Sequence, residues 1–417
     1  TDETSFMIEN LILGFEAALT LTNLLFIAAG ITLGIVIGAI PGLGSVTALA
    51  VLIPVTYYMS PIPAIAFLVG VNKGGTSGGA IPAILLNSPG TPEAAASALD
   101  GYPMAKRGEA TRAMKFALYS SVTGDTISDF LLIFLVVPFA AIALQFGPLE
   151  YTSVLLFAFA LLAGISGDSP IKGLIAIFFG VFLSTIGLDP VDSTSRMTFD
   201  NVNLFDGLPL IGLAIGSLAL ASILEQIFDL YRNPTENQHS AELTAQANKK
   251  LPIREFLSHW KTIGRSALIG SGVGMLPGLG VTLAAFLSYG ATRKASNDPN
   301  SFGKGNPQGI IATEAANSAV VGANLIPTIA LGVPGNIAAA LLIGAFIIHG
   351  IVPGPFMLTM HGDVIYALFA SMLMANFIHL AIGRIGIPVW AMVARTPKGL
   401  VLPPVIIMCI VGVYLPG

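Results

Sequence analysis

Apolar stretches long enough to cross a lipid bilayer recur along this chain, and they constrain its fold more than any other feature. A membrane-spanning helix needs roughly 17–25 mainly apolar residues. Only 10% of the residues are charged, whereas a soluble domain carries about 25%, so water could not solvate such a surface. The sequence therefore predicts an all-α polytopic membrane protein, with apolar stretches at 24–40, 116–146, 150–167, 171–188, 207–230, 364–383 and 399–416.

An internal repeat runs through the chain. The sequence GIVIGAIPGLG at residues 34–44 returns as GSGVGMLPGLG at 270–280, with glycines and a Pro-Gly pair in the same places. A longer stretch beginning NKGGTSGG at Asn72 and ending SPGT is matched by one beginning NSAVVGAN at Asn317 and ending VPGN. Matching segments of this length predict two copies of one structural unit, which is how many transporters are built.

The two copies carry opposite charge bias at equivalent positions. The first copy begins in an acidic segment at residues 1–23 and meets lysines and arginines at 106–115, after its second Pro-Gly pair. The second copy begins in a basic segment at 249–265, and after its second Pro-Gly pair it has no lysine or arginine until Arg384. Because lysine and arginine favour the cytoplasmic side, we expect two inverted-topology repeats.

The domain organisation follows from the repeat. Residues 1–170 form the first copy, 171–260 connecting spans and a cytoplasmic linker, and 261–417 the second copy. The polar stretch 231–261 is the expected surface linker. The second copy lacks the last two apolar segments of the first half, so we expect the natural protein to continue beyond Gly417 by about two spans.

Broken apolar segments are the candidate binding site. Irregular backbone survives at membrane depth only inside protein or facing a water-filled cavity, and such breaks in both halves point to a transporter's substrate site. Helix N-termini and glycine N–H groups can receive a carboxylate. The candidate substrate ligands are therefore Asn87, Ser88, Pro89, Gly90, Thr91, Pro334, Gly335, Asn336, Gly44 and Gly280, with Lys73 as the charge that would neutralise a carboxylate.

Oxygen-bearing side chains beside these breaks suit a small cation. A charge at membrane depth is costly and usually functional, which singles out Lys73 and Glu314; the alternative is that each lies shallow and snorkels to water. Asp125 and Asp129 form a polar patch one turn apart, for which coupling-ion binding is the less favoured interpretation. The candidate Na⁺ ligands are Asn72, Thr76, Ser77, Asn317, Ser318 and Glu314.

Other patterns favour structural roles. The GxxxG spacings around Gly34 and Gly270 are typical of close helix packing, and Cys409 is a lone thiol in an apolar run. His349, His361 and His379 lack metal-ligand spacing. No HExxH, GxSxG or Walker sequence is present, so we expect no cofactor and no nucleic-acid partner, and an intramembrane enzyme ranks last among the functions.

The broken segments together resemble one family. IPGLG, GGTSGGAIPAILLNSPGTPEAAASALDGYPMAKRG, LPGLGVTLAAFLSY, ATEAANSAVVGANLIPTIALGVPG and HGIVPGP resemble the large membrane subunit of tripartite tricarboxylate transporters, the TctA type. The resemblance runs from about Met7 onward. Where Lys73 stands, the family more usually has an aromatic or small residue, so this lysine would be particular to this chain. The chain also ends earlier than the family usually does.

The resemblance implies a function and partners. It implies uptake of citrate, other di- or tricarboxylates or aromatic carboxylates across the bacterial inner membrane, driven by a Na⁺ or H⁺ gradient rather than by ATP. The implied partners are a small TctB-type membrane subunit and a periplasmic TctC-type solute-binding protein. An elevator-like movement is expected by analogy. The alternative function is a channel-like carboxylate pore without ion coupling.

Overall fold

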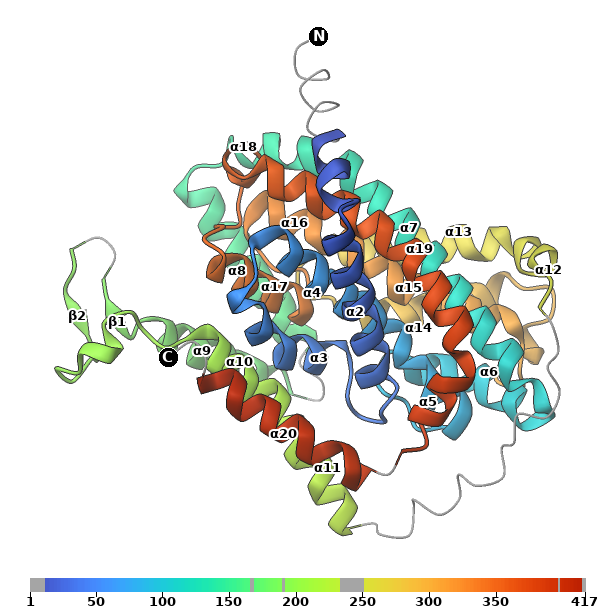
Figure 1. Ribbon diagram of the computed structural model, residues 1–417. Helices are drawn as coiled ribbons and strands as arrows, with labels where there is room; N and C mark the ends of the chain where they lie inside the picture. Colours follow the sequence, from blue (N-terminus) through green and yellow to red (C-terminus); the bar gives the residue numbers. More distant parts are fainter. Residues whose placement is uncertain (1–11, 166–168, 190–191, 233–250, 397, 415–417) are drawn as a thin grey trace.

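The structure is a computed structural model that describes residues 12–165, 169–189, 192–232, 251–396 and 398–414 (Figure 1). The helices of the first half are α2 (Leu21–Gly38), α3 (Ser45–Leu52), η1 (Ile53–Tyr58), α4 (Pro61–Gly78), α5 (Ala80–Leu86), α6 (Ala94–Met104), η2 (Ala105–Glu109), α7 (Ala110–Ala143), α8 (Pro148–Ile165), α9 (Pro170–Ser184), η3 (Val202–Leu204), α10 (Leu210–Ala214), η4 (Ile215–Leu220) and α11 (Ala221–Arg232).

The second half is also helical. Its elements are α12 (Ile253–Ser258), α13 (Trp260–Gly274), α14 (Gly280–Ala295), η6 (Pro299–Ser301), α15 (Pro307–Ala323), α16 (Leu325–Leu331), α17 (Ile337–Ile348), α18 (Met357–Met360), α19 (Gly362–Val393) and α20 (Lys398–Tyr414). A short antiparallel pair, β1 (Gly187–Leu188) with β2 (Ser195–Arg196), projects from one end beside α9 (Figure 1). The predicted helical membrane architecture is confirmed.

Four helical runs of the described residues are long and apolar enough to cross a membrane: Leu21–Gly38, Ala94–Ala143, Pro307–Leu331 and Gly362–Val393. The run at Pro307–Leu331 was not among the predicted spans, because its glycines and polar residues lower its hydropathy. It is buried inside the protein along its most apolar window. A helix covered by protein needs no apolar face toward lipid, so its composition differs from that of a lipid-facing span.

The elements of the second half follow those of the first in the same order. The helices α2 to α5 correspond to α13 to α16, α6 to α17, α7 to α19 and α8 to α20. Gly42 and Gly278, in the two Pro-Gly turns, have the same φ of 85°. The helices α5 and α16 end in left-handed residues, Asn87 and Gly332, and asparagine and glycine are the residues that adopt this conformation most easily.

The two longest helices, α7 and α19, run antiparallel. Asn376 of α19 donates to Asp129 of α7 at 2.8 Å, whereas Gly383 lies against Leu118. The residue number therefore falls along α7 as it rises along α19. This pairing packs a long helix of the first half against the corresponding long helix of the second half.

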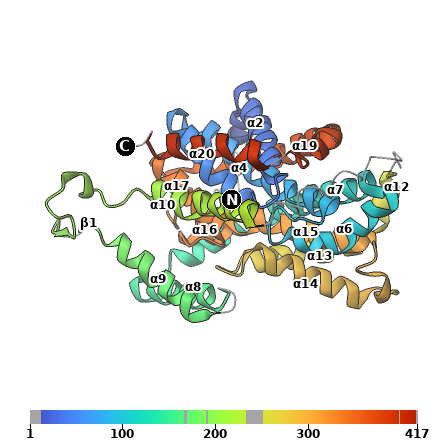
Figure 2. The ribbon, with the colours of Figure 1, turned by 90° about the horizontal axis from the view of Figure 1, so that it is seen from below.

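The helices form layers (Figure 2). On one side lie α2, α4, α19 and α20, on the other α13 and α14, with α15 between them. Glycines allow the close approach within each layer. A Cβ atom at Gly34 would lie closer than 3 Å to the carbonyl oxygen of Val71, and one at Gly270 equally close to that of Ala316. The GxxxG glycines therefore serve packing, as expected.

The predicted linker at 231–261 falls mainly on residues 233–250, which lie outside the described residues. Its last part is packed on the protein, since Phe256 of α12 is buried and meets Tyr119 of α7 edge to face, with ring centroids 5.6 Å apart. This part is therefore a docked helix and not a free surface segment. The lysines and arginines near α12 therefore lie next to a packed helix and not on a free segment.

Substitution of Gly270 tests the close approach of α13 to α15. We expect Gly270→Ala to push the helices apart and to lower the free energy of unfolding by about 1–3 kcal/mol. Gly272→Ala on the same helix is the matched control, because a Cβ atom there meets nothing within 4 Å. Thermal unfolding of the purified protein in detergent measures both, and equal melting temperatures for the two variants would contradict the packing.

Candidate substrate and ion site

A cavity of about 730 Å³ lies where the breaks of the chain meet. Its wall is formed by the first Pro-Gly turn, the first tip, which follows α5, the last residue of the second tip, which follows α16, the starts of α3, α14 and α17, the later part of α4, and residues of α15, η4 and α11. Its lining residues are Pro41, Gly42, Gly44, Ser45, Val46, Thr47, Asn72, Thr76, Ser88, Pro89, Gly90, Thr91, Pro92, Glu93, Ser217, Leu218, Ser222, Glu225, Gln226, Gly280, Val281, Thr282, Val321, Asn336, Ile337 and Ala338.

Helix N-termini open onto this cavity from four directions. Gly44 caps α3, Glu93 precedes α6, Gly280 begins α14 and Asn336 caps α17. The side chain of Asn336 accepts from the N–H of Ala339 at 2.9 Å. The first N–H groups of a helix lack partners within the helix and carry a partial positive charge, so the wall is suited to an anion. At α6 the N–H groups of Ala94, Ala95 and Ala96 already donate to the carbonyls of Thr91, Pro92 and Glu93, so this N-terminus contributes its dipole and not free donors.

The first tip is held in place by its sequence. Asn87 ends α5 in the left-handed conformation, and Pro89 cannot continue the helix. The N–H of Gly90 donates to the carbonyl of Gly79 at 3.3 Å. A Cβ atom at Gly90 would collide with the carbonyl oxygen of Gly38, so glycine lets this tip lie directly on α2 and α5.

The second tip is fixed by a bond to the Pro-Gly turn of its own half. The N–H of Gly278 donates to the carbonyl of Gly335 at 2.9 Å. Gly335 also lies so close to Asn324 that a Cβ atom would fall within 3 Å of its Cα. Both tips are thus anchored to backbone, which satisfies polar groups that lipid could not.

The charged side chains at the cavity wall are acidic. Glu93 and Glu225 line it, and among its lining residues in the described chain there is no lysine, arginine or histidine. Glu93 accepts from the hydroxyl of Thr282 at 3.5 Å. Gln226 is buried against Gly42, and its amide atoms have no hydrogen-bond partner among the described residues. An anion in this cavity would meet backbone dipoles and two carboxyl groups.

The structure brings part of the predicted site together. Nine of the predicted residues line the cavity: Asn72, Thr76, Ser88, Pro89, Gly90, Thr91, Gly44, Gly280 and Asn336. The others are not among its lining residues: Asn87, Pro334, Gly335, Lys73, Ser77, Asn317, Ser318 and Glu314. Their roles as substrate or Na⁺ ligands stay predictions.

Lys73 is buried and paired within the protein. Its Nζ donates to Asp129 Oδ2 at 2.6 Å and to Asn376 Oδ1 at 2.8 Å, and lies 3.7 Å from Asp125 Oδ1. The side chain has no exposed surface, so it does not snorkel. In this structure the carboxylate that faces Lys73 is Asp129, and the ammonium group does not reach the cavity wall.

Glu314 is also buried, in the middle of α15. Ser97 donates to its Oε1, and Ser121 donates to its Oε2 at 3.1 Å. One turn further on, the amide of Asn317 and the hydroxyl of Ser318 have no hydrogen-bond partner among the described residues. These unpartnered oxygens lie on the helix that matches α4, as the repeat predicted.

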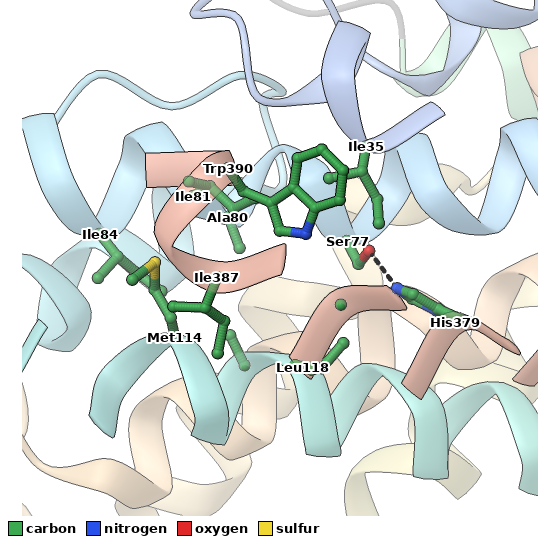
Figure 3. A pocket seen from close by; sticks show the side chains of 12 residues that line it. Ile35, Ser77, Ala80, Ile81, Ile84, Met114, Leu118, His379, Ile387 and Trp390 are labelled. Atoms are coloured by element: carbon green, nitrogen blue, oxygen red, sulfur yellow. Dashed lines mark hydrogen bonds between the residues drawn. The ribbon is translucent and has the colours of Figure 1, made fainter. Parts of the chain in front are cut away.

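Ser77 lies in a different place. Its hydroxyl shares a hydrogen bond of 2.7 Å with Nε2 of His379, beside Ile35 and Trp390 (Figure 3). The surrounding pocket is small, about 30 Å³, and mostly apolar. The bond supports the structural role predicted for His379, and it leaves Ser77 away from the other candidate Na⁺ ligands on the cavity wall.

The sequence analysis did not single out Asn376, Glu225 or Gln226, and it gave coupling-ion binding as the less favoured interpretation of Asp125 and Asp129. Asp125, Asp129 and Asn376 surround Lys73, whereas Glu225 and Gln226 close the cavity. A signal existed for most of them, because an acidic residue inside an apolar span is costly and Asp125, Asp129 and Glu225 stand in such spans. Nothing in the sequence indicated which of them face each other.

The fold and the cavity together define a polytopic helical membrane protein of the transporter class. Residues 24–416 match the Tripartite tricarboxylate transporter TctA family. The chain belongs to this family, and the resemblance noted in the sequence is confirmed.

Two curated relatives come from Agrobacterium vitis. An uncharacterized 52.8 kDa protein in the TAR-I ttuC' 3'region is 32% identical over 98% of this chain and 80% of its own length. An uncharacterized protein in the TAR-II ttuC' 3'region is 34% identical over 35% of this chain and 60% of its own length. No solved structure matches the chain.

A double-mutant cycle tests the pairing of Lys73 with Asp129. We expect Lys73→Met to lower the free energy of unfolding by about 3–5 kcal/mol, because it leaves buried carboxylates without their cation. Asp129→Asn should cost less, because Asp125 remains 3.7 Å from Nζ of Lys73. The double variant should lose less than the sum of the two. Thermal unfolding in detergent provides the measurement, with Lys172→Met, at an exposed lysine, as the control; additive losses would argue against the pair.

Proposed function

We propose that this chain is the large membrane subunit of a tripartite, binding-protein-dependent system that takes up tricarboxylates or related carboxylates by ion-coupled secondary transport. The observation that carries the proposal is the meeting of four helix N-termini at one cavity inside a helical membrane protein. Such N-termini favour anions. Membership of a tricarboxylate transporter family supports the substrate class.

Ion coupling is supported by the charges of the cavity wall. An anionic substrate would be placed beside Glu93 and Glu225 with no basic side chain among the described lining residues. Like charges at close range in a low-dielectric site repel strongly. A co-bound cation, Na⁺ or H⁺, would offset this repulsion, and Asn72 and Thr76 at the cavity wall, with Asn317 and Ser318, supply oxygens for Na⁺.

We further propose that the two halves are inserted in opposite orientations. The opposite charge bias of the two copies and the antiparallel course of the corresponding helices α7 and α19 support this arrangement. The movement we propose is elevator-like, with the tips sliding against the wall formed by η4 and α11 and the spans between residues 150 and 230. That both tips share a cavity with η4 and α11 supports such a sliding surface.

The proposed partners and location follow from the family. A small TctB-type membrane subunit would accompany this chain in the bacterial inner membrane, and a periplasmic TctC-type protein would deliver the carboxylate. The family name itself describes a tripartite system.

Uptake of labelled citrate into proteoliposomes that contain the three subunits tests this function. We expect accumulation above equilibrium when a Na⁺ or a pH gradient is imposed, because the cation offsets the negative charges beside the substrate. A competitor panel of di-, tri- and aromatic carboxylates covers the substrate class. Uptake that only equilibrates, whatever gradient is imposed, would indicate a channel-like pore and reject the coupling.

Asn336→Ala tests the role of the α17 N-terminus. Loss of an N-cap costs about 0.5–2 kcal/mol, and a comparable loss in substrate binding would raise the half-saturating carboxylate concentration roughly 2- to 30-fold. Asn201→Ala is the matched control, because Asn201 caps η3 in the same way, accepting from Asn203, but lies in an exposed segment. Unchanged half-saturation in Asn336→Ala, with the control also unchanged, would remove this N-terminus from the substrate site.

A further inference from the structure

The buried cluster around Lys73 does not balance its charge. Asp125 and Asp129 on α7 bring two carboxyl groups to one ammonium group, and all three side chains are almost completely buried. Asn376 adds a neutral amide. With each group in its usual ionised form, the cluster carries one excess negative charge away from water. Such a charge costs several kcal/mol unless a partner neutralises it.

The excess charge can be assigned to one residue. Asp129 Oδ2 accepts from both Lys73 and Asn376. Neither oxygen of Asp125 has a hydrogen-bond partner among the described residues, and its nearest cation is Lys73 Nζ at 3.7 Å. Lys73 is therefore hydrogen-bonded to Asp129, whereas its ion pair with Asp125 is longer, at 3.7 Å. Asp125 is the carboxyl group that no donor of the described residues hydrogen-bonds.

The helices packed around α7 do not supply the missing charge. On α15, Glu314 is an acid, and its oxygens are bonded by Ser97 and by Ser121, one turn before Asp125. On α19, His379 is turned to Ser77. The other ionisable groups on the described helices and turns that contact α7 are Lys261 and Arg265 of α13, Asp100 of α6, Lys106, Arg107 and Glu109 of η2, and Asp363 and Arg384 of α19.

Three of these more distant groups have hydrogen-bond partners away from Asp125. Arg265 donates to Thr292, Arg107 to the carbonyls of Lys304 and Gly305, and Asp100 accepts from Tyr289. Among the described residues, no ion pair joins Asp125 to a cation other than Lys73. Within the described residues, no second cation is available to offset the charge that Asp125 and Asp129 share with Lys73.

We propose that Asp125 binds a coupling cation, a monovalent ion that completes the charge of the Asp125–Asp129–Lys73 cluster and is separate from any cation held by the oxygens at the cavity. This inference rests on the proposed transport function and names the residue at which the gradient acts. Lys73 supplies a fixed cation for Asp129, and the exchangeable cation, Na⁺ or a proton, belongs to Asp125. Asn72, next to Lys73 in the chain, lines the substrate cavity, which connects the state of the cluster to the substrate.

Asp125→Asn tests the inference, because asparagine keeps the shape and removes the charge that needs a cation. Proteoliposomes with all three subunits receive a tenfold Na⁺ gradient in one arm and a tenfold proton gradient in the other. At one cation per substrate, either gradient sustains about tenfold accumulation of citrate. We expect the wild type to accumulate in at least one arm, and Asp125→Asn to fall to the equilibrium level there while retaining exchange of labelled for unlabelled citrate.

Ser128→Ala is the matched control. Ser128 is equally buried on α7, and its hydroxyl donates to the carbonyl of Asp125, so this variant removes a neighbouring polar group without changing the charge. It should accumulate citrate like the wild type. Accumulation of citrate by Asp125→Asn at the wild-type level would overturn the inference. It would also be overturned if Asp125→Asn, with an unchanged melting temperature, lost both citrate exchange and citrate accumulation.

If Asp125→Asn does not fold, a chemical-labelling measurement on the wild type still tests the inference. Dicyclohexylcarbodiimide attacks accessible protonated carboxyl groups, and peptide mapping locates the adduct. We expect labelling at Asp125 that Na⁺ or raised pH suppresses; labelling there that ignores both, or no labelling at Asp125 under any condition, would overturn the inference. Absence of citrate exchange by the wild type would instead contradict the proposed function itself, so the two failures are distinguishable.

Discussion

A polar backbone group inside a bilayer has no water to bond, and the arrangement of this protein follows from that constraint. Each break in a helix exposes N–H and carbonyl groups that only protein or an internal cavity can satisfy. The two tips meet this requirement through backbone bonds, Gly90 to Gly79 and Gly278 to Gly335. The N-termini of α3, α6, α14 and α17 are gathered at one cavity, so the requirement to shelter broken helices also creates a site for an anion.

Charge imposes a second constraint on the same site. The cavity wall has acidic residues and no basic ones among its described lining residues, and the one lysine within the broken segments is paired with Asp129 and is not among those residues. The substrate is therefore expected to bind to dipoles and not to a cationic side chain. Because dipoles leave net charge uncompensated, a carboxylate substrate and a cation are expected to bind together, which couples the two fluxes.

Much of this arrangement could be predicted from the sequence. The repeated Pro-Gly breaks pointed to nine of the residues that line the cavity, since breaks at matching positions of two halves are typical of a transporter's binding site. The pairing of Lys73 with Asp129 and Asn376 could not be predicted, because these residues are distant in sequence and only the packing of α4, α7 and α19 brings them together. The buried helix at 307–331 escaped for a related reason, since it is covered by protein and its composition is less apolar than that of a lipid-facing span.

The central claim is that the helix N-termini around the cavity hold the carboxylate. An experimental structure of the protein with bound citrate would test it most directly. The account predicts citrate density inside the cavity, with its carboxylates within hydrogen-bond distance of the first N–H groups of α3, α14 or α17 and close to both tips. Citrate bound elsewhere, or the two tips separated and facing lipid headgroups, would contradict it.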